Sequence, residues 1–209
     1  KSMNRDQTKS VIESSLRQIE TEFQATQGMI LTEDDLKCCI YKKLSENYPD
    51  LITPMQTEDG QINAPMLHTE LSWYDKYGRL TIKPDITILD PGFLSVLHKS
   101  GAEKVKLPSK SYSFRGDAVL MELKFIKNKR GIGKPTITRK LQEDVNKIER
   151  LFARLEDQDA PYDLFCYFVV FNKTNKKCLE FEQFIQKTNN EAQGKYRMIY
   201  ATGNVDFDD

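Results

Sequence analysis

The stretch AVLMELKFI, residues 118–126, decides the fold and carries the first candidate site residues. Its mostly apolar composition predicts a buried β-strand. A strand places alternate side chains on one face, so Glu122 and Lys124 project together. The opposite, buried face is filled by the odd-numbered residues Val119, Met121, Leu123 and Phe125. The sequence therefore predicts an acid and a base side by side on one core strand.

A second predicted strand, KPDITILD at residues 83–90, supplies another acid. Asp85 lies on its polar face between Lys83 and Thr87, opposite a face of isoleucines. If the two strands pair, the carboxylates of Asp85 and Glu122 meet. Two hard oxygen ligands suit Mg²⁺ or Mn²⁺, because Mg²⁺ keeps several waters and is usually held by one or two carboxylates plus substrate phosphate.

Pro84, Asp85, Glu122 and Lys124 together resemble the motif of the PD-(D/E)xK nuclease superfamily, which includes many restriction, recombination and repair endonucleases. The resemblance extends from the acidic helix near Leu31 to the strand near Phe171, about two thirds of the 209 residues. It implies a restriction-endonuclease-like α/β fold, in which helices flank a mixed central β-sheet. The connection between the two acids is longer than a hairpin needs, so we expect an insertion or an additional hairpin within it.

The resemblance also implies a reaction, the metal-dependent hydrolysis of phosphodiester bonds that leaves a 5′-phosphate. Asp85, Glu122 and the backbone carbonyl of Leu123 would hold one or two Mg²⁺ ions, with Mn²⁺ as a substitute. Lys124 would orient the attacking water or stabilise charge on the phosphoryl oxygens. We expect an endonuclease that acts on DNA, with RNA as the second substrate class.

Three glutamates are candidates to complete the metal site. Glu70 precedes the second strand and is either a metal or water ligand or a cross-strand partner of Lys83 or Arg79. Glu33 and Glu46 lie on an early predicted helix, from which members of the superfamily often supply a glutamate. The alternative for Glu33 is stabilisation of the helix N-terminus, and for Glu46 it is a surface position.

A helix predicted at residues 136–155 follows the motif and carries two further candidates. Lys140 and Gln142 lie on its polar face, together with Asp144 and Lys147. Members of the superfamily often place a lysine or glutamine on this helix to contact the metal-bound water or the substrate phosphate. The alternative is an exposed helix face.

A basic run without acidic residues follows the Glu-x-Lys strand, at residues 125–142. Cationic side chains beside catalytic carboxylates can hold phosphates that would otherwise be repelled. We expect Gly131 and Gly133 to let this loop move. The alternative is a solvated connection whose charges only aid solubility. The candidate nucleic-acid-binding residues are Lys127, Lys129, Arg130, Lys134 and Arg139.

The composition fits one compact domain over residues 1–209, since 39% of the residues are hydrophobic and can supply a core. The formal net charge is zero, so any attraction to nucleic acid must be local. A neutral chain also leaves room for a homodimer or for a partner subunit that provides target recognition. Roles in restriction, mobile elements or phage defence all stay open.

The cysteines have no C-x-x-C spacing and no paired histidines, which disfavours a structural zinc site. No apolar run is long enough to span a bilayer and no signal-peptide pattern is present, so we expect a cytoplasmic protein without a membrane partner. Lys1 and Ser2 before Met3 resemble a remnant of cloning, and residues 204–209 an acidic tail. Buried free thiols are expected at Cys38, Cys39, Cys166 and Cys178.

Further periodicities place helices around the strands. Residues 8–23 predict an amphipathic helix, and a second helix begins at Thr32, where Asp35 completes a capping arrangement, and ends at Pro49. The later elements are a hairpin at residues 66–90 turning at 75–78, the helix at 136–155, a buried strand at 163–172, a helix at 179–188 and an edge strand at 196–201. This order predicts an α/β layered sandwich.

Two other function classes fit parts of the sequence. A catalytically inactive nucleic-acid-binding module with the same fold would keep Asp85 and Glu122 in ion pairs with Lys83 and Lys124. A protein-interaction module would use the aromatic run YDLFCYFVVF, residues 162–171, as an oligomer interface.

Overall fold

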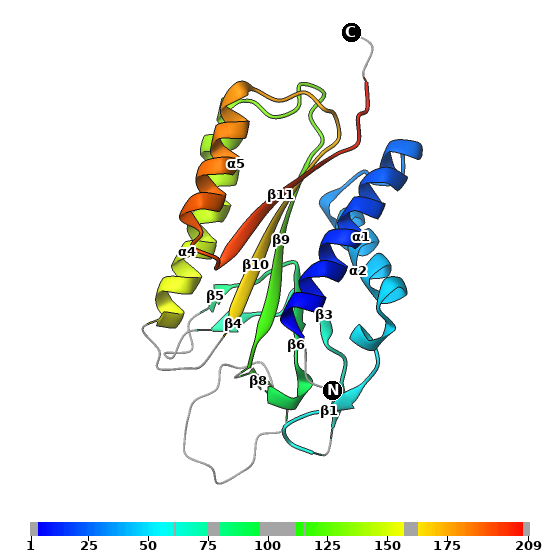
Figure 1. Ribbon diagram of the computed structural model, residues 1–209, viewed down its shortest axis with the longest axis vertical. Helices are drawn as coiled ribbons and strands as arrows, with labels where there is room; N and C mark the ends of the chain where they lie inside the picture. Colours follow the sequence, from blue (N-terminus) through cyan, green and yellow to red (C-terminus); the bar gives the residue numbers. More distant parts are fainter. Residues whose placement is uncertain are drawn as a thin grey trace.

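A five-stranded mixed β-sheet lies at the centre of the molecule, with helices on both faces (Figure 1). The computed structural model describes residues 4–60, 62–74, 80–96, 112–114, 116–156 and 163–206. The strands, in spatial order, are β11 (Tyr196–Thr202), β10 (Leu164–Asn172), β9 (Ala118–Ile126), β6 (Ile86–Leu89) and β3 (Leu67–Thr69). β9, β10 and β11 are parallel, whereas β6 is antiparallel to β9 and β3 is antiparallel to β6. The mixed α/β architecture expected from the sequence is confirmed.

Two pairs of helices cover the two faces of the sheet (Figure 1). α1 (Arg5–Ala25) and α2 (Glu33–Asn47) lie over one face, and α4 (Gln142–Glu156) and α5 (Leu179–Glu191) lie over the other. The odd-numbered side chains of β9 belong to the core shared with α1 and α2. Its even-numbered apolar side chains belong to the core shared with α4 and α5. The predicted division of the two faces of this strand is therefore confirmed.

The hairpin expected at residues 66–90 is divided between two sheets. β3 pairs directly with β6, while β4 (Trp73–Tyr74) pairs with β5 (Leu80–Ile82) outside the central sheet. The chain leaves the central sheet just after β3, at Glu70, whose φ of 52° lies in the left-handed region. The turn expected at 75–78 lies outside the described residues.

Two more pairs of short strands and two 3-10 turns lie near the connections. They are β1 (Met55–Gln56) with β2 (Asn63–Ala64), β7 (Leu94–Ser95) with β8 (Ser113–Phe114), and the turns Pro49–Leu51 and Pro91–Phe93. The antiparallel β7–β8 pair lies within the connection between the two acidic strands, where the sequence predicts an insertion or an additional hairpin. Residues 97–111, between these two strands, lie outside the described part of the chain.

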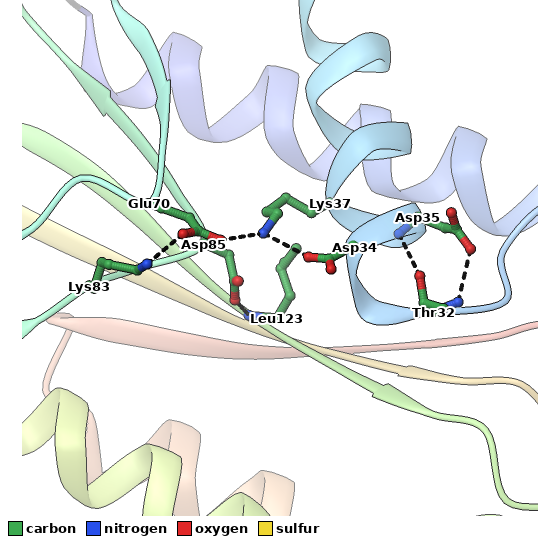
Figure 2. Close-up of polar contacts among 8 residues, drawn as sticks. All are labelled: Thr32, Asp34, Asp35, Lys37, Glu70, Lys83, Asp85 and Leu123. Carbon is green, nitrogen blue, oxygen red and sulfur yellow. Dashed lines mark hydrogen bonds and ion pairs between the residues drawn. The ribbon is translucent and has the colours of Figure 1, made fainter.

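The second helix begins with the predicted capping box. Oγ1 of Thr32 accepts a hydrogen bond from the backbone N–H of Asp35 at 3.0 Å, and Oδ2 of Asp35 accepts one from the backbone N–H of Thr32 at 3.0 Å (Figure 2). These bonds satisfy donors that a helix start leaves without partners. They fix the position at which α2 starts, and therefore the position of Glu33.

The helix expected at residues 136–155 is longer and irregular. It starts with α3 (Lys134–Thr136), passes through a π-helical turn (Ile137–Leu141) and continues as α4. A π-turn holds more residues than an α-helical turn, so it rotates the side chains before it relative to those after it. The apolar stripe predicted from regular helical spacing is nevertheless the buried one, from Ile137 and Leu141 to Leu151 and Phe152.

β10 is the central buried strand that the sequence predicts, and β11 is the predicted edge strand. The outward-facing backbone groups of β11 are partly covered by side chains. Asn189 donates to the carbonyl of Met198 at 3.2 Å and accepts from its N–H at 2.7 Å. Farther along, Gln24 donates to the carbonyl of Thr202 and Glu20 accepts from its N–H, both at 2.8 Å.

The four cysteines are free thiols but differ in exposure. Cys166 is buried, Cys39 and Cys178 are half-buried, and Cys38 is exposed. The expectation of four buried thiols is therefore right for Cys166 alone. In the part of the chain that the structure describes, no helix has both the length and the apolar surface needed to cross a bilayer.

Candidate active site

The antiparallel pairing of β6 with β9 brings the two predicted acids together. Ile86 lies opposite Met121, so Asp85 and Glu122 are the next facing positions along the two strands. Oδ2 of Asp85 accepts a hydrogen bond from the backbone N–H of Leu123 at 2.8 Å (Figure 2). The strand pairing on which the two-carboxylate prediction depends is present.

β9 continues past the position at which β6 begins, so part of its backbone edge has no neighbouring strand. Carboxylates accept hydrogen bonds from the N–H groups along this part of the edge. Phe125 donates its N–H to Oε2 of Glu33, the first residue of α2, at 3.0 Å. The N–H and C=O of one residue point to the same side of an extended strand, so the carbonyl of Leu123 faces the side on which Asp85 lies. The structure thus brings Glu33, rather than Glu46, to this edge.

The carboxyl group of Glu122 is largely buried, and its Oε2 makes no hydrogen bond. Burial, and then the neighbouring carboxylates of Asp85 and Asp144, raise the pKa of Glu122 from 4.5 to about 8. A buried polar atom without a partner costs free energy. A cation at this position would remove that cost and lower the pKa, which is the behaviour expected of a metal ligand.

Asp85 lies in a similar environment. Burial raises its pKa, and the charge of Glu33 adds to the increase, whereas the N–H of Leu123 and the charges of Lys37 and Lys124 oppose it. Among the described residues, neither Asp85 nor Glu122 forms an ion pair. The two acids therefore lack the pairing with Lys83 and Lys124 that an inactive module would show.

Lys124 lies between two carboxylates from different helices. Its Nζ is 3.4 Å from Oδ2 of Asp144 on α4 and 3.6 Å from Oε2 of Glu33 on α2. Burial alone would lower the pKa of Lys124, but Asp144 and Glu33 outweigh this effect and raise it. Lys124 is therefore a charged donor that carboxylates from helices on both faces of the sheet hold in place.

Asp144 is a site residue that the sequence interpretation left on the polar helix face. Only 6% of its side chain is exposed, and it also accepts a hydrogen bond from Lys147 at 2.9 Å. A sequence signal was available, because Asp144 falls three residues after Leu141 and four before Ile148 within the apolar stripe.

Glu70 is held by two lysines at the end of β3. Its carboxylate accepts hydrogen bonds from Lys37, at 2.7 Å, and from Lys83, and these bonds lower its pKa to about 2. Lys37 also pairs with Asp34 at 2.9 Å (Figure 2). The backbone N–H of Glu70 donates to the carbonyl of Asp85 at 3.1 Å. Glu70 is therefore a partner of Lys83, which is the alternative role considered for it above. Its backbone lies beside that of Asp85, a candidate metal ligand.

Three other candidates do not reach the two acids. Glu46 pairs with Lys42 and Lys43 on the surface of α2. Gln142 donates to Asn146 at 2.9 Å along α4, and Lys140 is exposed on the π-turn. The alternatives of a surface glutamate and an exposed helix face describe these residues, whereas Asp144, on the same helix as Gln142, reaches Lys124 on β9.

The basic run follows β9 directly. Lys127, Lys129 and Arg130 are exposed beyond its end, and Arg139 is exposed on the π-turn. Lys134 is committed to an ion pair with Glu180 at 2.6 Å. Gly131, in the loop that the sequence analysis expects to move, packs tightly against the backbone of residue 176.

A cavity of about 580 Å³ lies beside the site, between α2 and β3. Lys37, Tyr41 and His68 line it. Nε2 of His68 hydrogen-bonds the carbonyl of Pro65 at 2.9 Å, and burial lowers its pKa, so His68 is a neutral structural side chain.

Metal-binding capacity at this site depends on two acids and a carbonyl. Within the described ranges, no three or more His, Cys, Asp and Glu side chains gather closely enough to hold a metal ion. Asp85, Glu122 and the carbonyl of Leu123 nevertheless fit Mg²⁺, which retains several waters and needs one or two carboxylates.

Comparisons of the chain with protein-family models, curated proteins and solved structures found no match.

Proposed function

We propose that this protein is a metal-dependent nuclease of the PD-(D/E)xK type, with a restriction-endonuclease-like arrangement of its sheet and helices. The observation that carries the proposal is the buried carboxyl of Glu122, with an oxygen that has no hydrogen-bond partner, facing Asp85 across the β6–β9 pair. A protein core rarely retains such a group unless it has a function. Lys124 supplies a cation on the same face of the strand.

The proposed ligands are Asp85, Glu122 and the carbonyl of Leu123, with Mg²⁺ as the resident ion and Mn²⁺ as its substitute. When bound, the ion polarises the phosphate and lowers the pKa of a bound water. The protein supplies a partly dry site, in which both carboxylates are held by strand pairing before substrate arrives. Glu33 contributes by fixing the edge of β9 through Phe125.

Lys124 donates from Nζ to the phosphoryl oxygen on which charge develops, or to the attacking water. Asp144 and Glu33 hold this ammonium from opposite faces of the sheet. In the overall reaction the water oxygen bonds to phosphorus, the P–O3′ bond breaks, and the 3′-oxygen leaves with a proton. The products are a 5′-phosphate and a 3′-hydroxyl, and DNA is the proposed substrate.

Cleavage assays with labelled single- and double-stranded DNA and RNA, in Mg²⁺, Mn²⁺ or EDTA, test the proposal. Metal-dependent cleavage is expected for the native chain and should be lost in Glu122→Gln. Lys124→Ala should lower the rate by about 100-fold or more, as loss of a transition-state donor does. Glu46→Gln is the matched control, because it removes a surface carboxylate and should leave the rate unchanged.

Equal cleavage by Glu122→Gln and the native chain would contradict the proposal. Nucleic-acid binding without cleavage in every metal would favour the inactive binding module. The interaction-module alternative has less support, because residues 164–171 of its aromatic run are buried within the chain itself.

A further inference from the structure

Two loops that are distant in sequence lie together at one end of the central sheet (Figure 1). The first, residues 127–133, follows β9, and the second, residues 173–178, follows β10. Backbone hydrogen bonds join them: Ile132 donates to the carbonyl of Lys176 at 3.0 Å, and Cys178 donates to the carbonyl of Ile132 at 2.8 Å. The two loops therefore form one unit.

Gly131 sets how closely the loops approach. Its φ is +66°, and a Cβ at this position would lie 1.8 Å from the carbonyl oxygen of Lys176. Any side chain would both strain the backbone and push the second loop away. The Lys176 carbonyl also accepts a hydrogen bond from Asn172 at 3.0 Å, so the second loop is fixed to the end of β10.

The joined loops carry positive charge that acidic side chains leave uncompensated. Lys134 and Lys177, at the margins, pair with Glu180 and Glu182. The exposed cations that form no ion pair with any described residue are Lys127, Lys129, Arg130 and Lys176. In a chain with zero formal net charge, this concentration of cations is a local source of positive potential.

The charged surface begins next to the candidate active site. Lys127 follows Lys124 by three residues, which spans about 10 Å of extended chain. Along one strand of a duplex this equals about three nucleotides of axial rise. A backbone whose scissile phosphate lies at Lys124 can therefore place nearby phosphates over the loops.

We infer that the two loops form a composite site for the sugar-phosphate backbone of nucleic acid, to which Lys176 contributes together with Lys127, Lys129 and Arg130. The inference rests on the proposed nuclease function and adds a second chain segment to its substrate contacts. The site recognises phosphates rather than bases, so it contributes affinity without sequence preference.

Binding of a short fluorescein-labelled duplex DNA, followed by anisotropy in EDTA over a series of salt concentrations, tests the inference. Lys176→Ala should weaken binding several-fold and reduce the slope of log K against log salt by about 0.9, the value for one phosphate contact. Lys176→Arg should restore both. Lys187→Ala removes the same charge from the exposed face of α5 and should change neither.

Gly131→Ala tests whether the close approach of the loops matters apart from charge. It keeps every cation but separates the loops, so it should weaken binding at least as much as Lys176→Ala. A thermal melt and circular dichroism spectrum like those of the native chain establish that the fold persists. Native-like binding by Lys176→Ala, or no binding by the native chain, would overturn the inference.

Binding and cleavage separate this inference from the proposed function. Binding that depends on Lys176, without cleavage in any metal, would support the composite site and refute the nuclease. Cleavage by the native chain, with unchanged binding and rate in both Lys176→Ala and Gly131→Ala, would support the nuclease and refute the composite site.

Discussion

At Glu122, burial and neighbouring negative charge act in the same direction on one carboxyl group. Its pKa is raised to about 8, whereas the ordinary value is 4.5. Between pH 4.5 and about pH 8, the carboxyl group of Glu122 is therefore protonated to a greater extent in the folded state than in the unfolded state. The stability of the metal-free protein should fall as the pH rises through this window and be fully regained below it.

Glu122→Gln should remove this pH dependence, because glutamine occupies the same space without a charge. In EDTA, the native chain should lose about 1.4 kcal/mol of unfolding free energy for each pH unit within the window. Urea denaturation of both proteins near pH 4.5 and pH 8 measures the difference. A native chain equally stable at both ends would show that Glu122 is charged in the folded, metal-free state.

Asp144 is predicted to position Lys124 rather than touch the substrate. Asp144→Asn keeps the side-chain volume but removes the negative charge that lies 3.4 Å from Nζ of Lys124. We expect kcat to fall by about 10- to 100-fold, as is typical when a supporting side chain is lost, with little change in KM. Steady-state kinetics test this, with the neighbouring exposed residue as the Glu143→Gln control. A rise in KM alone would point to a substrate contact instead.

Among the elements, α2 combines a strong start signal with a site residue. Thr32→Ala removes one half of the capping box and should cost about 1 kcal/mol of unfolding free energy. Glu33 follows the cap directly, so fraying of this turn should also lower the cleavage rate. Chemical denaturation and cleavage rates measure both effects. Thr21→Ala, at an exposed position near the C-terminal end of α1, is the control and should change neither property.

The elements also show what the sequence predicts and what it does not. The strand expected at residues 118–126 has those bounds in β9, because its alternating apolar and charged side chains match a buried sheet. The choice between Glu33 and Glu46 depends on how α2 lies against β9, which is a tertiary contact without a local signal. Asp144 was missed because an acidic residue of an amphipathic helix is normally assigned to its polar face, although its spacing from Leu141 and Ile148 places it within the apolar stripe.

For the whole molecule, metal binding should appear as stability as well as activity. A ligand that binds the folded state stabilises it by about 2.7 kcal/mol at a concentration 100 times its Kd. Mg²⁺ or Mn²⁺ should therefore raise the Tm of the native chain, and EDTA should reverse the increase. Asp85→Asn should show no such increase, whereas Glu46→Gln should respond like the native chain. Equal responses by all three proteins would place the binding elsewhere.

The side chains of Asn189, Glu20 and Gln24 along β11 also bear on how the molecules behave toward one another. A sheet edge with unpaired N–H and C=O groups is a template on which a strand from another molecule can add. Here the N–H and C=O groups of Met198 and Thr202 already form hydrogen bonds with side chains of the same chain. At the opposite edge β3 spans only Leu67–Thr69, too short for a long foreign strand to add. The partly covered edge at β11 and the short edge at β3 therefore hinder the addition of a strand, and concentrated solutions of the folded protein should resist the strand-by-strand association that leads to fibres.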